Sequence, residues 1–300
     1  MDTLEIRAYA KVNLGLDVVR KLENGYHEVR MVMQTVNIYD TLTLKRAEKG
    51  IELTADNEAL PKDENNLVYK AARLLMDSCH IGEGISIHLE KRIPVAAGMA
   101  GGSSDAAAVM KGMNELFSLG ISEEELCRMG VNLGADVPYC IMGGTALAEG
   151  IGEKLTRLPD APDCFLLVVK PDIDVSTKYV YEHLALSNIK RHPDIDGMVE
   201  AIRKGSLQGV TGRMDNVLQS VTEREYPIIT GLKCFMEENG ACKALMSGSG
   251  PTVFGIFEEE GKANAAKKRL GGMQLAGQCF VTTFSPKEEG YAGKFTGKHG

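Results

Sequence analysis

The chain has 300 residues, enough for one large domain or two of ordinary size. Hydrophobic residues make up 44% and charged residues 25%, as in a globular protein, and the net charge of −7 disfavours nucleic-acid binding, which needs a basic surface. No run approaches the roughly 18 apolar residues of a membrane span, and the N-terminus is unlike a signal peptide. We therefore expect a cytoplasmic protein with neither membrane nor nucleic-acid partners.

The first part of the chain, over residues 1–155, is predicted to form a mixed α+β domain. Apolar residues alternate or recur at helical spacing, and Asn24-Gly25 marks a turn between strands. Residues 134–139 are too rich in helix breakers to continue a helix. Strands are expected over residues 4–19, 29–36, 40–44, 85–89 and 145–148, and helices over 65–79, 105–117 and 122–133.

A polar segment with two prolines, residues 156–163, reads as a linker to a second domain over 163–285. Without its middle helices, that domain has the order β-α-β-β-α-β, which predicts a ferredoxin-like fold. The tail 286–300 has no apolar period and is predicted to be disordered. Strands are expected over 165–169, 244–247, 253–257 and 280–284, and helices over 177–184, 195–204, 228–238 and 262–270.

A glycine-rich stretch begins at Pro94 and ends in Ser103-Ser104, before an alanine-rich helical run. Glycines before a helix start direct free N–H groups and the positive end of the helix dipole at one point, which favours phosphate. A tight turn before a buried helix is the alternative, but the paired serines add donors that a turn does not need. The spacing fits neither a Walker A loop nor a dinucleotide fingerprint.

Phosphoryl transfer requires a phosphate cradle, a cation and a carboxylate that orients or deprotonates the acceptor. Lys11 lies on the same face of a predicted strand as Asn13, although such a lysine is as often a solvated edge charge. Asp136 is the only charge in an apolar, sharply bent segment; taken alone, it is more often a turn residue. The turn over residues 247–252 has more glycine and serine than a hairpin needs, and suggests a second wall around the same ligand.

Three stretches resemble, in order, the three motifs of the GHMP small-molecule kinases. They are Ala10-Lys11-Val12-Asn13-Leu14, the glycine-rich stretch Pro94 to Ser104, and Ser247-Gly248-Ser249-Gly250-Pro251. The resemblance implies a two-domain fold with an N-terminal domain like ribosomal protein S5 domain 2 and a ferredoxin-like C-terminal domain. It also implies an ATP-dependent kinase, either monomeric or weakly dimeric.

The same resemblance assigns roles to individual residues. Asp136 would be the base for the acceptor hydroxyl, and Lys11 would keep it ionised and offset charge on the phosphoryl group. Mg²⁺ is expected with ATP, but the acidic magnesium ligand of several family members has no counterpart here, so no metal ligand is assigned. The residues implied around ATP are Asn65, Asn66, Leu67, Pro94, Ala96, Gly98, Met99, Ala100, Gly101, Gly102, Ser103 and Ser104.

Two flanking features, Gly25-Tyr26-His27 and Gly134-Ala135-Asp136-Val137-Pro138, resemble the family members that phosphorylate a cytidine diphosphate-linked polyol for non-mevalonate isoprenoid synthesis. Tyr26 would stack on the cytosine opposite a second aromatic, Tyr181 or its rival Tyr179. A homoserine or mevalonate kinase, or a non-catalytic metabolite sensor on this scaffold, is the alternative. The residues implied around the acceptor are Asn13, Tyr26, His27, Tyr181, Gly248 and Ser249.

Overall fold

The computed structural model describes residues 2–272 and 277–285; the tail predicted to be disordered, 286–300, lies outside them. The strands are β1 (Thr3–Lys21), β2 (His27–Ala47), β3 (Ile51–Ala55), β4 (Gly84–Glu90), β5 (Thr145–Glu149), β6 (Lys154–Arg157), β7 (Phe165–Lys170), β8 (Asp215–Asn216), β9 (Lys243–Met246), β10 (Val253–Phe257) and β11 (Gln278–Thr283). The α-helices are α1 (Leu67–Ser78), α2 (Gly101–Leu116), α3 (Glu123–Gly130), α4 (Val137–Met142), α5 (Thr177–His183), α6 (Ile195–Arg203), α7 (Leu207–Thr211), α8 (Gln219–Glu225), α9 (Ile228–Glu238) and α10 (Glu260–Gly271), with a short 3₁₀ helix at Leu186–Asn188.

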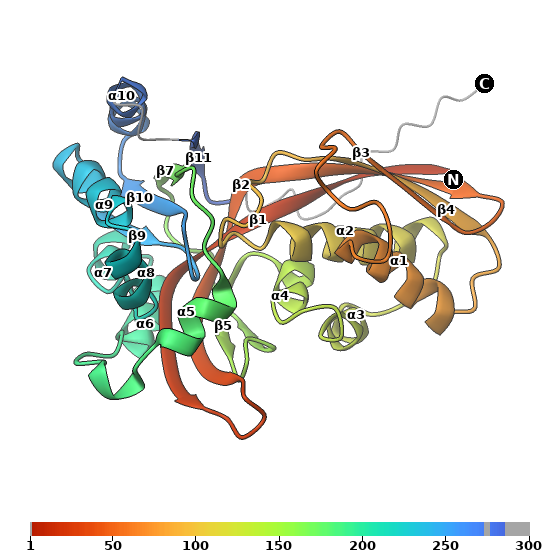
Figure 1. Ribbon diagram of the computed structural model, residues 1–300, viewed down its shortest axis with the longest axis horizontal. Helices are drawn as coiled ribbons and strands as arrows, with labels where there is room; N and C mark the ends of the chain where they lie inside the picture. Colours follow the sequence, from red (N-terminus) through yellow and green to blue (C-terminus); the bar gives the residue numbers. More distant parts are fainter. Residues whose placement is uncertain (1, 273–276, 286–300) are drawn as a thin grey trace.

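A large sheet carries the first half of the chain. Its order is β3-β4-β2-β1-β8, with β5 paired to β2 and β6 paired to β5. Helices α1 to α4 lie along one face of this sheet (Figure 1). Strand β8 comes from the second half of the chain and pairs in parallel with β1, so the two halves share one sheet.

The second sheet confirms the predicted ferredoxin-like arrangement. Its order is β11-β7-β10-β9, and every neighbouring pair is antiparallel. Helices α9 and α10 connect these strands, as the predicted order required. This sheet and helices α6 to α10 gather at one end of the long strands β1 and β2 (Figure 1).

Strand β2 is continuous where the sequence predicted two strands. The break falls at an irregularity: Tyr9 pairs with Tyr39, but Lys11 pairs with Thr35. A bulge re-aims backbone groups without ending the strand. Here it frees Lys11 N to donate to Met99 O at 3.1 Å and frees Thr35 O to accept from Ser285 N at 3.0 Å.

Two helix starts also differ from the prediction. Helix α2 begins at Gly101, not at Asp105, so both serines of the glycine-rich stretch lie in its first turns. Helix α4 begins at Val137, inside the segment predicted to be non-helical. Pro138 is compatible with this start because the first N–H groups of a helix have no intrahelical partner anyway.

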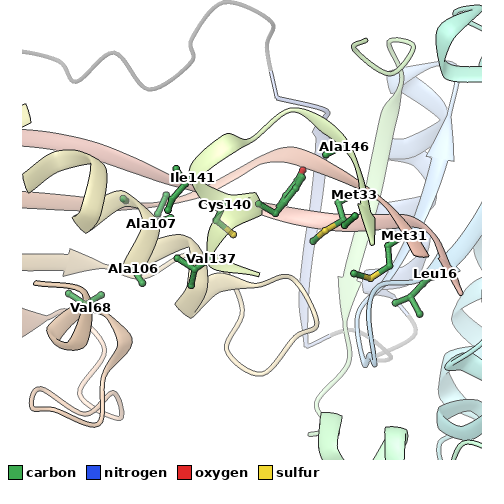
Figure 2. Close-up of a cluster of buried hydrophobic side chains, with 14 of the residues drawn as sticks. Leu16, Met31, Met33, Val68, Ala106, Ala107, Val137, Cys140, Ile141 and Ala146 are labelled. Carbon is green, nitrogen blue, oxygen red and sulfur yellow. The ribbon is translucent and has the colours of Figure 1, made fainter. Parts of the chain in front are cut away.

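Helix α4 is anchored in the main hydrophobic core. Figure 2 shows its residues Val137, Cys140 and Ile141 in one cluster with Ala106 of α2 and Met33 of β2. These residues are at most 4% exposed. The short helix that starts beside Asp136 is therefore held by packing on both sides.

Two further features of the described residues bear on the class of protein. Each of their helices is too short or too polar to span a membrane. All seven cysteines are free thiols, and Cys140 and Cys164 are the buried ones.

Candidate active site

One cavity of about 1010 Å³ brings the separated motifs together. It is lined by the glycine-rich stretch, by the start of α1, by β1 and by the late Ser-Gly turn. All the predicted site residues line it except Met99 and Ser104. Met99 is buried and uses its carbonyl to hold Lys11 N, while the Ser104 hydroxyl donates to Tyr9 O inside the protein.

The glycine-rich stretch approaches α2 through an unusual backbone. Ala96, Gly98 and Ala100 all have positive φ, at 52°, 70° and 57°. Ala100 occupies the N-cap position of α2 and makes no capping bond with its side chain. The first N–H groups of α2 are therefore left without a capping side chain beside the cavity, an arrangement suited to phosphate.

The late Ser-Gly turn closes directly on this stretch. Ser247 Oγ donates to Gly98 O at 2.9 Å, and a Cβ on Gly98 would lie 2.4 Å from Ser247 O. Only glycine fits such an approach. The two turns thus form adjoining walls of one cavity, as the sequence suggested.

Asn216 of β8 holds the late turn in place. Its buried Nδ2 donates to Met246 O and Gly248 O, both at 2.8 Å. Thr222 Oγ1 donates to Ser249 O at 3.1 Å, and the Thr177 and Ser249 hydroxyls lie 2.8 Å apart. Sequence reasoning missed these supports, because nothing in the chain pattern around Asp215-Asn216 marks a buried strand.

Lys11, Asn13 and Asp136 form a polar cluster in the cavity wall. Lys11 Nζ lies 2.9 Å from Asn13 Oδ1 and 3.6 Å from Asp136 Oδ2. Its side chain is only 6% exposed, so it is not a solvated edge charge. Asp136 stands at the N-cap of α4, makes no capping bond and leaves a third of its side chain accessible.

The far end of the cavity carries an aromatic pair. The rings of His27 and Tyr181 lie 5.2 Å apart, and Tyr26 and Tyr181 both line the cavity. Tyr179 does not line it and stacks instead on His183 at 3.8 Å. Burial, followed by the Lys21 charge, lowers the pKa of His27, and burial raises the pKa of Tyr181, so both side chains stay neutral at pH 7.

The cavity also contains charged residues that the sequence did not indicate. Lys91 and Asp105 line its α1 end, and Glu182 lines its aromatic end. Lys91 follows a strand and precedes an arginine, a sequence context that predicts a side chain exposed to solvent. In the fold its ammonium is buried and pairs with Asp40, 51 residues away in the chain, and with Asp105 of α2.

The comparisons with known proteins agree with this geometry. The model of the GHMP kinases N terminal domain matches residues 66–144, and that of the GHMP kinases C terminal region matches residues 198–273. The 4-diphosphocytidyl-2-C-methyl-D-erythritol kinase of Lachnospira eligens is 54% identical over 95% of this chain and 100% of its own. The chain belongs to the GHMP kinase family. It is a kinase, and ATP is the phosphate donor that this family implies.

Solved structures of GHMP kinases share the fold. A crystal structure of a 4-(cytidine 5'-diphospho)-2C-methyl-D-erythritol kinase has a TM-score of 0.81 and 31% identity, and the match covers 94% of this chain and 100% of that one. A homoserine kinase from Cytophaga hutchinsonii has a TM-score of 0.79 at 22% identity, over 95% of both chains. These matches confirm the predicted two-domain GHMP kinase fold. The likeness to the homoserine kinase supports the fold alone.

Proposed function

We propose that this GHMP kinase transfers the γ-phosphoryl group of ATP to the 2-hydroxyl of 4-diphosphocytidyl-2-C-methyl-D-erythritol, in non-mevalonate isoprenoid precursor synthesis. The observation that carries the proposal is the shared cavity. Its aromatic end, with His27 and Tyr181 5.2 Å apart, is continuous with the glycine-rich cradle and with Asp136. A homoserine or mevalonate acceptor has no base that would use the aromatic end.

The aromatic end suits a neutral pyrimidine. The pKa of His27 is lowered, first by burial, so its neutral ring has one nitrogen that donates and one that accepts. A cytosine edge offers the complementary donor and acceptors. Tyr181 and Tyr26 line this end of the cavity, and stacking of a base on an aromatic ring contributes about 1–3 kcal/mol.

In the proposed reaction, Asp136 takes the proton of the 2-hydroxyl as its oxygen attacks the γ-phosphorus. The bond from the γ-phosphorus to the β,γ-bridging oxygen breaks, and ADP leaves with that electron pair. The Lys11 ammonium, 3.6 Å from Asp136 Oδ2, offsets charge on the transferring group. Asn13 Oδ1 holds the ammonium in place at 2.9 Å.

The cavity is compatible with Mg²⁺ that arrives bound to ATP. Within residues 2–272 and 277–285, no three histidine, cysteine or acidic side chains gather as a metal cage. Mg²⁺ needs only one or two protein ligands, because phosphate oxygens and waters complete its shell. The Ser103 hydroxyl and the Asp136 carboxylate are the cavity oxygens that would serve, and the ion would neutralise charge on the phosphates.

Titration of cytidine monophosphate into the protein tests the acceptor site without catalysis. We expect Tyr181→Ala to weaken binding about 10-fold or more, because a stacking face is lost. The matched control is Tyr179→Ala, which removes a tyrosine two residues away outside the cavity and should change affinity less than about 2-fold. Equal effects of the two substitutions, or no measurable binding by the unmodified protein, would count against a cytidine site here.

A further inference from the structure

A separate cavity of about 540 Å³, which we call the α9 cavity, lies in the second half of the chain. Helices α7, α8 and α9 and strands β8 and β9 contribute to its wall, at the end of the molecule that holds the second sheet (Figure 1). Among the described residues, none lines both this cavity and the candidate active site. The proposed reaction makes no use of it.

Cations outnumber carboxylates in the wall of the α9 cavity, and the carboxylates already have partners. Asp194 accepts from Gly197 N at 2.9 Å and from Arg213 Nε at 3.0 Å. Asp215 accepts from Asn216 N at 2.8 Å. An anion in the cavity would therefore meet a wall with an excess of positive charge. The charged residues that line it are Arg191, Arg213, Lys233, Lys243, Asp194 and Asp215.

The cations retain hydrogen-bond donors for a ligand. Lys233 Nζ donates to Glu223 Oε1 at 2.7 Å, and Lys243 Nζ lies 3.1 Å from Glu237 Oε1; neither carboxylate lines the cavity. An ammonium has three N–H groups, so each lysine keeps donors after this pairing. The Arg191 side chain makes no ion pair or hydrogen bond with the rest of the described chain. Its guanidinium can hold an anion through two N–H groups at once.

A buried amide supplies a further donor. Gln219 of α8 is 8% exposed and lines the α9 cavity. Its Oε1 accepts from Met246 N at 2.9 Å, and Nε2 has no acceptor among the described residues. Buried side-chain donors in folded proteins normally have a partner. An unused donor in a cavity wall therefore marks a position for an acceptor atom of a ligand.

The wall of the α9 cavity also supports the late Ser-Gly turn of the candidate active site. Gln219 accepts from Met246 N, and Asn216, next to Asp215, donates to Met246 O at 2.8 Å. Met246 directly precedes Ser247, whose hydroxyl donates to the glycine-rich stretch. A ligand on Gln219 would thus contact a residue that holds one wall of the candidate active site.

We propose that the α9 cavity binds a small molecule that carries a phosphate or diphosphate group. The phosphate oxygens accept from Gln219 Nε2 and from the Arg191 guanidinium, and the ammonium groups of Lys233 and Lys243 offset the charge. These donors come from α8, from the segment before α6, from α9 and from β9. A phosphate has enough oxygens to meet donors from several sides, whereas a carboxylate has only two. The inference goes beyond the proposed reaction and does not depend on ATP or on the acceptor.

Alkylation of Cys242 by iodoacetamide tests the site locally. Cys242 is exposed and lines the α9 cavity, whereas Cys234, also exposed, lies on α9 and does not line it. We expect inorganic diphosphate or inorganic phosphate, at about 10 mM, to slow the alkylation of Cys242 about 5-fold or more, because the bound anion covers the thiol. Cys234 should change by less than about 2-fold, and potassium chloride at the same ionic strength should protect neither thiol. Peptide mass spectrometry measures both rates in one sample.

Two variants connect the protection to the wall of the α9 cavity. Arg191→Gln and Lys243→Gln should each require about 10-fold more anion for the same protection of Cys242, because a charge-assisted hydrogen bond is lost. Lys204→Gln, at the end of α6 and outside the cavity, is the matched control and should keep full protection. The ratio of rates with and without anion is compared within each variant, which removes any effect of the substitution on the thiol itself.

The two probes separate the sources of the phosphate group. Protection at lower concentration by diphosphate supports a diphosphate ligand, and protection at lower concentration by phosphate supports a monophosphate ligand or free phosphate. Cys242 alkylation that neither anion slows would overturn the inference, as would equal protection in Arg191→Gln, Lys243→Gln and Lys204→Gln. Because the readout needs neither ATP nor acceptor, its failure would leave the proposed kinase reaction untouched.

Discussion

Lys11 is a cation that strand β1 places almost out of water, where a charge is costly without partners. Its ammonium has Asn13 Oδ1 at 2.9 Å and Asp136 Oδ2 at 3.6 Å. The bulge that re-aims its backbone also ties it to Met99 O. One residue thus connects the carboxylate, the acceptor wall and the glycine-rich stretch, which is the geometry that phosphoryl transfer needs.

Replacement of Asp136 by Asn tests the proposed base at the scale of one residue. Turnover should fall by about 10²- to 10⁴-fold, the usual contribution of a general base. The dissociation constant for ATP should change by less than about 3-fold, because the glycine-rich stretch is untouched. Steady-state kinetics and calorimetry measure the two quantities, with the exposed Asp77→Asn on α1 as control. Near-normal turnover of Asp136→Asn would rule out this residue as the base.

Sequence reasoning reached Asp136 because it is the only charge in an apolar, sharply bent segment. It reached Lys11 through the resemblance of Ala10-Lys11-Val12-Asn13-Leu14 to a GHMP kinase motif. It could not find Lys91, whose burial depends on Asp40, 51 residues away in the chain. It also placed Ser104 beside ATP, whereas the hydroxyl donates to Tyr9 O. Side-chain direction within a glycine-rich stretch depends on where the helix starts, and that start was predicted four residues late, at Asp105 instead of Gly101.

Helix α4 illustrates control at the scale of an element. Asp136 stands at its start, and two cations meet its final carbonyls: Lys111 Nζ donates to Ile141 O at 3.0 Å and an Arg157 nitrogen donates to Met142 O at 3.2 Å. Positive charge at a helix C-terminus is favourable. Lys111 is nevertheless deeply buried, and burial lowers its pKa to about 7.

Lys111→Met should therefore stabilise the protein at pH 7, by about 1–2 kcal/mol after the lost hydrogen bond is counted. Between pH 7 and the ordinary lysine value of 10.5, the unfolded chain binds one more proton than the folded chain. The free energy of unfolding of the unmodified protein should therefore contain a contribution from Lys111 that increases with pH across this window. Lys111→Met should lack this increase. Urea unfolding at several pH values measures both effects. A less stable variant with an unchanged pH slope would contradict the assignment.

The contact between the two glycine turns is a second prediction at this scale. Gly98→Ala should destabilise the protein by about 1–3 kcal/mol and weaken ATP binding, because φ is +70° and Ser247 O lies 2.4 Å from the new Cβ. Ala100→Gly is the control in the same stretch, because Ala100 also has a positive φ of 57° and here glycine replaces alanine. This substitution should be neutral or slightly stabilising. Thermal unfolding and ATP calorimetry report the pair. Equal destabilisation by both would show that the turn geometry is not the cause.

Elements were predictable where the local pattern was clear, as for the helical apolar spacing of α1 and the apolar runs that form the strands of the second sheet. Strand β8 was not predictable, because it has two residues and gains its strand geometry only by pairing with β1. The continuity of β2 was also hidden, because a bulge and a strand end look alike along one chain. These features depend on tertiary pairing, which local patterns do not contain.

At the scale of the whole molecule, the cavity is built by both halves of the chain. The first half supplies the cradle, Lys11 and Asp136, and the second half supplies Tyr181 and the Ser247 turn. Shared pairing through β8 and the bond from Ser285 N to Thr35 O join the halves across the linker region. We propose domains over residues 1–155 and 163–285, with catalysis at their junction.

The most direct test of this account is the rate of ADP release from ATP and Mg²⁺ with three acceptors offered separately. We expect turnover with 4-diphosphocytidyl-2-C-methyl-D-erythritol and none above background with mevalonate or homoserine, because only the first fills the aromatic end. Turnover with mevalonate or homoserine would contradict the proposed acceptor site. No turnover with any of the three, from protein that still binds ATP, would contradict the proposed reaction.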